Sequence, residues 1–406
     1  MTRRLYFEDA FLRAFASSVT ARREDAAGAW LGLEATAFYP EGGGQPWDTG
    51  TLSGPGGACR VTEVRLDGDG VIWHRAEAAP GARLPETGEA VEGRIDWERR
   101  FDHMQQHTGE HILANCVHRL AGGFIHGLHI GSEVSSIDVT LPGGETRLPE
   151  ETLDEIETLA NRRLAEDGDV VCRIPKPGEL AALPLRKDPT VKESVRVCAV
   201  GDYEMVACGG THLRSAAQVG LIKILSAQPA RGKMRVFFLC GLRAARYFQA
   251  CHRSLSRVGA MLNAGVEQAP ERLAALQAQM GEARRGLAAL RGRLAEALAP
   301  GLTETAGPLP DGGLLVSHRL DGEESDLMEH LAQALIARPG IVALLTAPSA
   351  DGEACLFARS QNRGEDMREL LKQAGARGGG RPDWARGVAS AADLDAAAAA
   401  VLSGGG

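Results

Sequence analysis

Two pairs of potential metal ligands, about a hundred residues apart, most constrain how this chain can fold. The first pair is His107 and His111, and the second pair is Cys208 and His212. Residues i and i+4 lie on one face of a helix, so both imidazoles of the first pair can point at one ion. The two pairs together offer three nitrogens and one thiolate, a set that suits zinc. If one ion binds all four side chains, two distant segments must converge beside it.

The residues around the second pair favour a tight turn but leave the kind of zinc site open. Gly209 and Gly210 follow Cys208 and permit a turn that brings the thiolate and the His212 imidazole to one ion. Four protein ligands are typical of a closed structural site, whereas a catalytic site would loosen one ligand or hold a water in the fourth place. Zinc at a cleft would make hydrolysis the leading chemistry.

The first pair also fits a zinc-peptidase signature. Residues 107–111 have the pattern H-x-x-E-H, in which Glu110 would be the general base. This interpretation needs a downstream acidic ligand and gives no role to Cys208. A metallopeptidase is therefore the alternative enzyme.

Composition indicates a globular, cytoplasmic protein of two to four domains. The chain has 406 residues, of which 44% are hydrophobic and 24% are charged. It has neither a signal peptide at its start nor an apolar run long enough for a membrane span. Eight scattered cysteines without a C-x-x-C pattern indicate reduced thiols.

The net charge of −8 argues against non-specific binding to DNA or RNA, but it permits an RNA substrate on a local basic patch. Solvated strand and loop faces are an equally good explanation of such patches. The candidate patch residues are Arg186, Lys187, Lys192 and Arg196, then Lys223, Arg231, Lys233 and Arg235.

The pattern of apolar residues predicts an α+β protein with four parts. Short alternating runs such as 35–39, separated by glycine-rich turns, predict a small barrel-like β domain over 1–98. A helix over 101–120 followed by strands and a second helix predicts a central α+β domain over 99–247. A helical linker over 248–305 and a small α/β domain over 306–406 complete the chain.

The helical linker carries a heptad seam. Its apolar residues alternate in steps of three and four, which suits a coiled coil or a helical hairpin. The seam can join two subunits in a homodimer or pack within one chain, and the sequence does not decide between them. The seam residues are Leu273, Leu276, Met280, Ala283, Leu287, Leu290, Leu294 and Ala297.

A glycine cluster at 40–46 is the remaining feature with a chemical interpretation. It contains Gly43, Gly44 and Gln45. The cluster can be a flexible hairpin loop, or it can let the backbone approach a ligand while Gln45 offers an amide donor and acceptor. It is not a phosphate-binding loop, since no lysine follows and no G-x-G-x-x-G occurs.

Taken together, these motifs resemble a known family. Residues 38–46, Phe-Tyr-Pro-Glu-Gly-Gly-Gly-Gln-Pro, are similar to the glycine-rich motif of the AlaX family of alanyl-tRNA editing proteins. The motifs at 107–111 and 208–212 resemble that family's paired zinc motifs, which also occur in the editing domains of alanyl- and threonyl-tRNA synthetases. Residues 378–383, Gly-Gly-Gly-Arg-Pro-Asp, resemble part of the small C-terminal domain of alanyl-tRNA synthetases. The chain therefore resembles the long form of AlaX.

The resemblance implies a free-standing trans-editing enzyme with a Zn²⁺ cofactor. Its expected substrate is tRNA(Ala) wrongly charged with serine, and Gly-tRNA(Ala) is a second candidate. Nothing before residue 100 would hold a class II aminoacylation domain, which favours an editing enzyme over a full synthetase. The C-terminal domain would help to hold the tRNA or form a dimer. The expected metal ligands are His107, His111, Cys208 and His212.

Other site residues are expected beside these ligands. Thr108 and Thr211 are next to ligands and can bond the substrate or support the ligands, although packing alone would explain them too. Asp138 can line the pocket or be an exposed strand residue. We expect catalytic roles for Gln45 and Thr108, and substrate contacts from Gly43, Gly44, Gln45, Asp138 and Thr211.

A third interpretation is a zinc module that binds tRNA without catalysis. Replacing Glu110 by Gln should abolish a peptidase but be far better tolerated by a deacylase. A zinc-loaded protein that binds Ser-tRNA without hydrolysing it would support the non-catalytic module.

Overall fold

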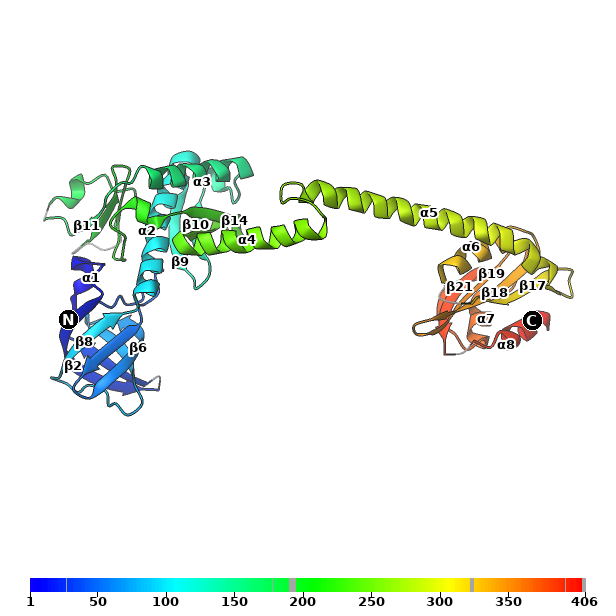
Figure 1. Ribbon diagram of the computed structural model, residues 1–406, viewed down its shortest axis with the longest axis horizontal. Coiled ribbons are helices and arrows are strands. Elements are labelled where there is room, and N and C mark those ends of the chain that lie inside the picture. Colours follow the sequence, from blue (N-terminus) through cyan, green and yellow to red (C-terminus); the bar gives the residue numbers. More distant parts are fainter. Residues whose placement is uncertain (27, 177, 190–194, 322–324, 391, 404–406) are drawn as a thin grey trace. The chain divides into compact units, whose positions relative to one another are not determined.

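The computed structural model describes residues 1–406 except 27, 177, 190–194, 322–324, 391 and 404–406, which are drawn as a grey trace in Figure 1. The chain divides into two units, Met1–Leu255 and Ser256–Gly406. In the described ranges, no helix has both the length and the apolar character needed to cross a membrane. The finer boundaries expected at residues 98, 247 and 305 stay predictions.

Six antiparallel strands close a barrel at the start of the first unit, in the order β2-β3-β7-β6-β5-β8. Alternate residues face its interior, as in the strict alternation of buried and exposed residues along β8. This confirms the predicted N-terminal barrel. The strands are β2 Ala14–Asp25, β3 Gly28–Leu33, β5 Gly50–Gly54, β6 Gly57–Leu66, β7 Ile72–Ala78 and β8 Ala90–Ile95.

The strand predicted over 35–39 is much shorter than expected. Only β4 (Ala35–Thr36) is a strand, and it pairs with β1 (Arg3–Arg4), which is followed by the short helix α1 (Leu5–Glu8). Beyond β4, the backbone N–H of Tyr39 donates to Asp48 Oδ2 at 2.6 Å. A side-chain acceptor therefore replaces a strand partner there, which the alternating pattern of apolar residues does not indicate.

A long helix, α2 (Trp97–Ala121), leaves the barrel and crosses one face of a four-stranded antiparallel sheet, confirming the predicted helix over 101–120. Arg100 of α2 forms a fully buried ion pair with Asp48 and donates to the carbonyls of Ala10 and Ala37. These bonds fix the helix to the barrel. The sheet has the order β14-β15-β10-β9, with β14 Ile222–Ala230, β15 Lys233–Cys240, β10 Ser135–Thr140 and β9 Phe124–Ile130.

The core of this region lies between α2, the sheet and α3 (Glu150–Ala165). Ile112 and Val117 of α2 are buried with Ile137 of β10 and Ile156 of α3. A second, three-stranded sheet of order β11-β12-β13 leads directly into the segment that contains Cys208. Its strands are β11 Val170–Arg173, β12 Val197–Val200 and β13 Glu204–Ala207, and short 3₁₀ turns lie at Pro142–Gly144, Leu180–Ala182 and Ala216–Val219.

The segment predicted to be helical over 248–299 consists of two helices. They are α4 (Gly241–Met261) and α5 (Ala269–Glu304), separated by a turn in which Asn263 has a φ of 51°. Pro270 lies in the first turn of α5, where it needs no helical hydrogen-bond donor. The apolar seam residues of α5 from Leu273 to Leu294 are largely exposed. A coiled coil through this seam stays a prediction.

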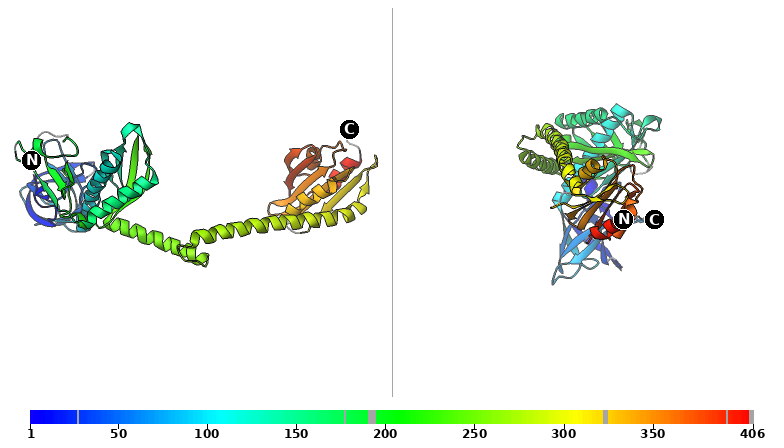
Figure 2. Two further views of the ribbon diagram at one scale, coloured as in Figure 1. Left: turned by 90° about the horizontal axis from the view of Figure 1, so that it is seen from above. Right: turned by 90° about the vertical axis from the view of Figure 1, so that its right-hand side faces the viewer.

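The second unit is a six-stranded sheet with helices on both faces (Figure 2). One buried cluster joins the sheet to α6 (Ser325–Ile336) and the end of α5, and another joins it to α7 (Met367–Gln373) and α8 (Leu394–Leu402). Among the described neighbours in this sheet, β17 and β18 are the parallel pair, and the others are antiparallel. In spatial order the strands are β16 Gly307–Pro308, β17 Leu314–Arg319, β18 Ile341–Ser349, β19 Gly352–Arg359, β21 Trp384–Ala389 and β20 Arg377–Arg381.

Candidate metal centre

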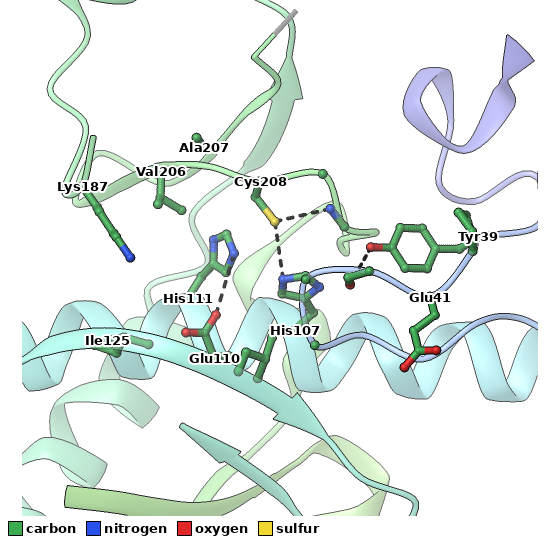
Figure 3. A pocket seen from close by; sticks show the side chains of 18 of the residues that line it. Tyr39, Glu41, His107, Glu110, His111, Ile125, Lys187, Val206, Ala207 and Cys208 are labelled. Atoms are coloured by element: carbon green, nitrogen blue, oxygen red, sulfur yellow. Dashed lines mark hydrogen bonds and ion pairs between the residues drawn. The ribbon is translucent and has the colours of Figure 1, made fainter. Parts of the chain in front are cut away.

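The four predicted ligands converge at one place in the first unit. His107 and His111 project from one face of α2 towards Cys208, which lies in the segment after β13 (Figure 3). His212 of the same segment completes the cluster. One ligand atom from each residue lies within 4.8 Å of the others. Cys208 Sγ is 3.4 Å from His107 Nε2 and 3.2 Å from His212 Nε2. The sequence spacing therefore predicted a real spatial cluster.

The tight turn between Cys208 and His212 depends on Gly210. A Cβ atom at this position would lie 2.1 Å from Cε1 of His107, which no side chain can tolerate without displacing the imidazole. Arg196 stabilises the turn, because its Nη1 donates to the carbonyls of Cys208 and Gly210 at 3.1 and 2.8 Å. The turn is thus both closely packed and hydrogen-bonded.

Gln45 orients the first ligand. Its Oε1 accepts from the backbone N–H of Thr211 at 3.2 Å and from Nδ1 of His107 at 2.8 Å, and its Nε2 donates to the Thr211 hydroxyl at 2.8 Å. Because a backbone N–H can only donate, the oxygen of the amide is the atom that faces His107. Nδ1 of His107 is then protonated, which leaves the lone pair of Nε2 directed at the cluster.

Thr108 supports the fourth ligand in a similar way. Its buried hydroxyl accepts from the backbone N–H of Leu213 at 3.1 Å and lies 3.3 Å from Nδ1 of His212. If Nε2 of His212 binds a metal, Nδ1 carries the proton and donates to Thr108. Both residues that we expected to be catalytic thus contact metal-ligand side chains.

The electrostatics of the cluster fit a metal ion. Burial lowers the pKa of His107 to about 3 and the pKa values of His111 and His212 well below the ordinary value, so the imidazoles are neutral and can bind a metal. Burial also raises the pKa of Cys208 to about 12, and a bound metal would reverse this by stabilising the thiolate. Nδ1 of His111 is buried without a hydrogen-bond partner among the described residues, as expected of an atom that a metal would bind.

A second set of donors shares one of these ligands. Cys172 and Cys198 face each other across β11 and β12, and their sulfurs lie within 4.8 Å of a ring nitrogen of His212. This set offers three donors, whereas the set with Cys208 offers four of the types that zinc prefers. The residues present therefore fit zinc best at His107, His111, Cys208 and His212.

A cavity of about 800 Å³ adjoins the cluster. His107, His111 and Cys208 form part of its wall, and Gly43 and Gly44 form another part. The glycine loop lies close to β9, since a Cβ at Gly44 would be 1.9 Å from the carbonyl oxygen of Leu128. This close approach is to β9, and the approach of the glycine backbone to a ligand stays a prediction.

Three of the expected substrate residues do not line this cavity. Gln45 and Thr211 are fully buried and bonded to each other behind His107. Asp138 pairs with Arg235, its opposite residue on β15, with oxygen–nitrogen distances of 2.6 and 2.8 Å. Asp138 is thus engaged in a cross-strand ion pair on β10.

The cavity wall also contains charged residues that are not among the predicted metal ligands and substrate residues, including Glu110, the general base of the metallopeptidase alternative. Glu110 lies on its wall, 3.8 Å from Nε2 of His111, and burial raises the pKa of its carboxyl group to about 7. The basic residues of the wall are Arg4, His126, Arg186 and Lys187. Arg186 and Lys187 belong to a predicted basic patch, but the sequence did not indicate that they line the same cavity as the glycine loop.

The other members of the predicted basic patches have separate positions. Arg196 is buried behind the Cys208 turn, and Lys223 and Arg235 pair with Glu157 and Asp138. Lys192 lies outside the described residues.

Two family profiles match the first unit. The profile described as tRNA synthetases class II (A) matches residues 11–99, which include the barrel. The profile described as threonyl and alanyl tRNA synthetase second additional domain matches residues 195–237, which include Cys208 and His212. Residues 195–237, with two of the four clustered side chains, are therefore similar to the second additional domain of these synthetases.

Individual relatives extend this match over most of the chain. Alanine–tRNA ligase of Pyrococcus abyssi is 33% identical over 396 residues, which cover 95% of this chain but 42% of the ligase. Alanyl-tRNA editing protein AlaX-L of Pyrococcus horikoshii is 30% identical over 404 residues, which cover 95% of this chain and 94% of that protein. The chain thus belongs to the AlaX family of alanyl-tRNA editing proteins, as the motifs predicted.

Two further similarities concern parts of longer proteins. Alanine–tRNA ligase of Pyrococcus furiosus is 36% identical over 304 residues, and the match covers 32% of its length. The chain thus spans less than half the length of the ligases it matches. The solved C-Ala domain of Aquifex aeolicus alanyl-tRNA synthetase is 24% identical and matches 24% of this chain and 98% of that domain, with a TM-score of 0.22 that carries no argument about the fold.

Proposed function

We propose that this protein is a zinc-dependent hydrolase that removes the amino acid from mischarged tRNA(Ala), chiefly from Ser-tRNA(Ala), with Gly-tRNA(Ala) as a second candidate substrate. One observation carries the proposal: the four-donor cluster adjoins a cavity that is also lined by the glycine loop and by Arg4, Arg186 and Lys187. Such a cavity offers donors for a metal, space for a small amino acid and cations for the phosphates of an RNA end.

The proposed reaction is hydrolysis of the ester between the amino acid and the terminal ribose. Zinc, when bound, would supply Lewis-acid chemistry at the ester. Gln45 and Thr108 hold His107 and His212 in the orientation and tautomer that binding requires. The closely packed glycine loop forms the wall against which a small side chain would lie. Lys187 would attract the adjoining phosphates, whereas Arg186 is already paired with the buried Glu204.

Selectivity would come from a partner for the serine hydroxyl. A pocket with a polar group for that hydroxyl disfavours alanine, because alanine leaves the group unpaired. Sites built to bond a hydroxyl can discriminate by about 10⁴-fold. We therefore expect Ala-tRNA(Ala) to be spared.

The deciding experiment compares deacylation of Ser-, Gly- and Ala-charged tRNA(Ala) by the full chain, before and after treatment with a chelator. We expect hydrolysis of the serine ester, little hydrolysis of the alanine ester, loss of activity on chelation and recovery with added Zn²⁺. Full zinc occupancy with tRNA binding and no hydrolysis would instead support a non-catalytic tRNA-binding module.

A metallopeptidase is the second candidate, because Glu110 lies on the cavity wall beside His111. Glu110→Gln should abolish hydrolysis of peptides by such an enzyme. A deacylase should keep most of its rate on Ser-tRNA(Ala). In the described part of the chain, the clusters of potential ligands contain histidine and cysteine but no carboxylate, which favours the deacylase.

The cellular setting follows from this function. The proposed partner is mischarged tRNA(Ala), and neither DNA nor a membrane is needed for the reaction. We place the protein in the cytoplasm, where aminoacyl-tRNA is made.

A further inference from the structure

A second cavity of about 530 Å³ lies beside the metal centre within the first unit. The two cavities share structural elements. Gly42–Gly44 line the first cavity and Pro46 lines the second, so one loop borders both. On α2, His107 lines the first cavity and His103 lines the second. These residues are one helical turn apart, which corresponds to about 6 Å along the axis.

His103 is a buried polar side chain on the wall of this cavity. It is 3% exposed, and its Nδ1 is buried with no hydrogen-bond partner in the part of the chain that the structure describes. Burial, followed by the nearby Arg99 and Arg243, lowers its pKa to about 3, so the ring is neutral. Buried polar atoms are normally hydrogen-bonded, so a molecule in the cavity is expected to satisfy this ring.

The charges around the cavity favour an anion. Arg99, Arg243 and Arg246 line it, and α4 begins there at Gly241, which adds the positive end of a helix dipole. Of the two carboxylates on the wall, Asp102 is already paired with Arg243, and Glu98 is exposed. Arg246 is exposed and has no recorded ion-pair partner among the described residues.

The cavity also has an aromatic wall. Trp97 and Phe101 both line it, with ring centroids 5.7 Å apart. Aromatic side chains next to guanidinium groups are the usual surface on which a single-stranded nucleotide is bound, since the ring contacts the base or ribose and the cation contacts the phosphate.

We propose that this second cavity binds a nucleotide of the single-stranded acceptor end of the tRNA, next to the nucleotide whose ester enters the first cavity. Arg246 and the start of α4 receive its phosphate, Trp97 contacts its base or ribose, and His103 forms a hydrogen bond to it. The inference rests on the proposed function, because it assumes that the ligand of the first cavity is a tRNA end.

The first test measures binding without hydrolysis. Uncharged tRNA(Ala) and the trinucleotide CpCpA are titrated against the zinc-loaded full chain and its Arg246→Ala variant. Because Arg246 is exposed, its replacement should leave the fold intact, and circular dichroism checks that the variant is folded. We expect about 5- to 10-fold weaker binding of both RNAs and a salt slope reduced by about 0.7, as for one lost phosphate contact on a single strand.

Two further variants test whether the position and the sign of the charge determine binding. Arg253→Ala removes the same charge two turns further along α4, at an exposed position outside the cavity wall, and should change binding less than twofold. Glu98→Gln removes a repelling carboxylate from the wall and should strengthen binding by about twofold. Equal effects of Arg246→Ala and Arg253→Ala would overturn the proposal, because they would indicate general electrostatic attraction.

The second test separates this proposal from the proposed function. The Arg246→Ala variant should raise KM for Ser-tRNA(Ala) but leave hydrolysis of the serine ester of adenosine, which has no phosphate, unchanged. If the wild type hydrolyses Ser-tRNA(Ala) and Arg246→Ala changes neither KM nor tRNA binding, the proposal for the second cavity is wrong and the proposed function stands. Absence of hydrolysis by the wild type would overturn the deacylase, while weaker CpCpA binding by Arg246→Ala would still support the cavity.

Discussion

The buried amide of Gln45 determines which nitrogen of His107 is available to a metal. Gln45, which we expected at the substrate, contacts His107, a predicted metal ligand, and lies off the cavity wall. The bond joins the barrel loop to α2 and, through Thr211, to the Cys208 turn. The glycine loop and the metal centre are therefore held as one piece.

Removal of that amide should weaken metal binding. For Gln45→Ala we expect a 10- to 100-fold loss of Zn²⁺ affinity, typical of removing a group that orients a ligand. Competition with a chromophoric chelator measures it. Asp138→Ala is the control, since Asp138 pairs with Arg235 and lies off the cavity wall, and its Zn²⁺ affinity should stay within twofold. A loss of similar size in both variants would contradict this role of Gln45.

Local spacing predicted the cluster of His107, His111, Cys208 and His212, whereas the contacts of single residues depended on the tertiary structure. His107 and His111 needed only the periodicity of a helix. The bond from Gln45 to His107 spans 62 residues and depends on how the loop packs against α2. The pairing of Asp138 with Arg235 follows from the register of β10 and β15, which the sequence of either strand does not specify.

At the scale of elements, α2 is the part on which most of the site depends, because it carries two ligands and borders both cavities. It packs very closely on β15, since a Cβ at Gly109 would lie 2.3 Å from the sulfur of Cys240. The helix and most strands of this region were predictable from their apolar periods. The turn between α4 and α5 was not predicted, because the heptad residues from Leu273 to Ala297 all lie in α5 and contain no information about the chain before it.

Two helical glycines should therefore respond oppositely to alanine. Gly109→Ala must displace α2 from β15, and we expect a loss of about 1–3 kcal/mol in the free energy of unfolding. Gly286→Ala in α5 is exposed with nothing within 4 Å of the added Cβ, so we expect a gain of about 0.5–1 kcal/mol from helix propensity. Denaturant unfolding of each variant measures both changes. Destabilisation by Gly286→Ala would contradict the argument from packing.

The barrel should lose stability in acid through His74. This residue is fully buried, its Nδ1 donates to the carbonyl of Leu31, and its Nε2 lies 2.8 Å from the Thr36 hydroxyl. Burial lowers its pKa from 6.5 to about 4. The folded state therefore binds this proton less readily than the unfolded state, so the stabilisation is complete above about pH 6.5 and is lost as the pH falls towards 4.

A non-titrating variant isolates this contribution. Between pH 7 and pH 4.5, the wild type should lose about 2–3 kcal/mol more unfolding free energy than His74→Gln. Urea unfolding at the two pH values gives the difference, and acid effects of the other buried histidines cancel because both proteins contain them. Equal losses in the two proteins would mean that His74 is already accessible to protons in the folded barrel.

At the scale of the whole molecule, the two units are different kinds of structure. The first contains the metal centre and both cavities, and the second is a sheet covered by helices on both faces. The barrel and the mixed α+β character were predictable, because strand alternation and helical periodicity extend over many residues. The oligomeric state depends on exposed surfaces, and the sequence does not identify the partner that would cover them.

The exposed seam of α5 gives the prediction for assembly. Leu287, Leu290 and Leu294 are 49%, 60% and 47% exposed, a stripe that a second copy would bury. We therefore expect a homodimer in light scattering, and a monomer for the double variant Leu287→Glu, Leu294→Glu. Replacement of Arg284 and Arg285 on the same helix by Gln, which changes the net charge by the same amount as the double variant, is the charge-matched control. A wild-type monomer at micromolar concentration would contradict this role of the seam.

The wide separation of the ligands along the chain sets an order of events during biosynthesis. A ribosome adds about 5–20 residues per second, so His107 and His111 are made about 5–20 s before His212 completes the set. Until Cys208 and His212 are made, the proposed set has only the imidazoles of His107 and His111, which are too few ligands to retain zinc. If the four residues bind zinc together, metal loading is a late step that follows the emergence of the segment after β13.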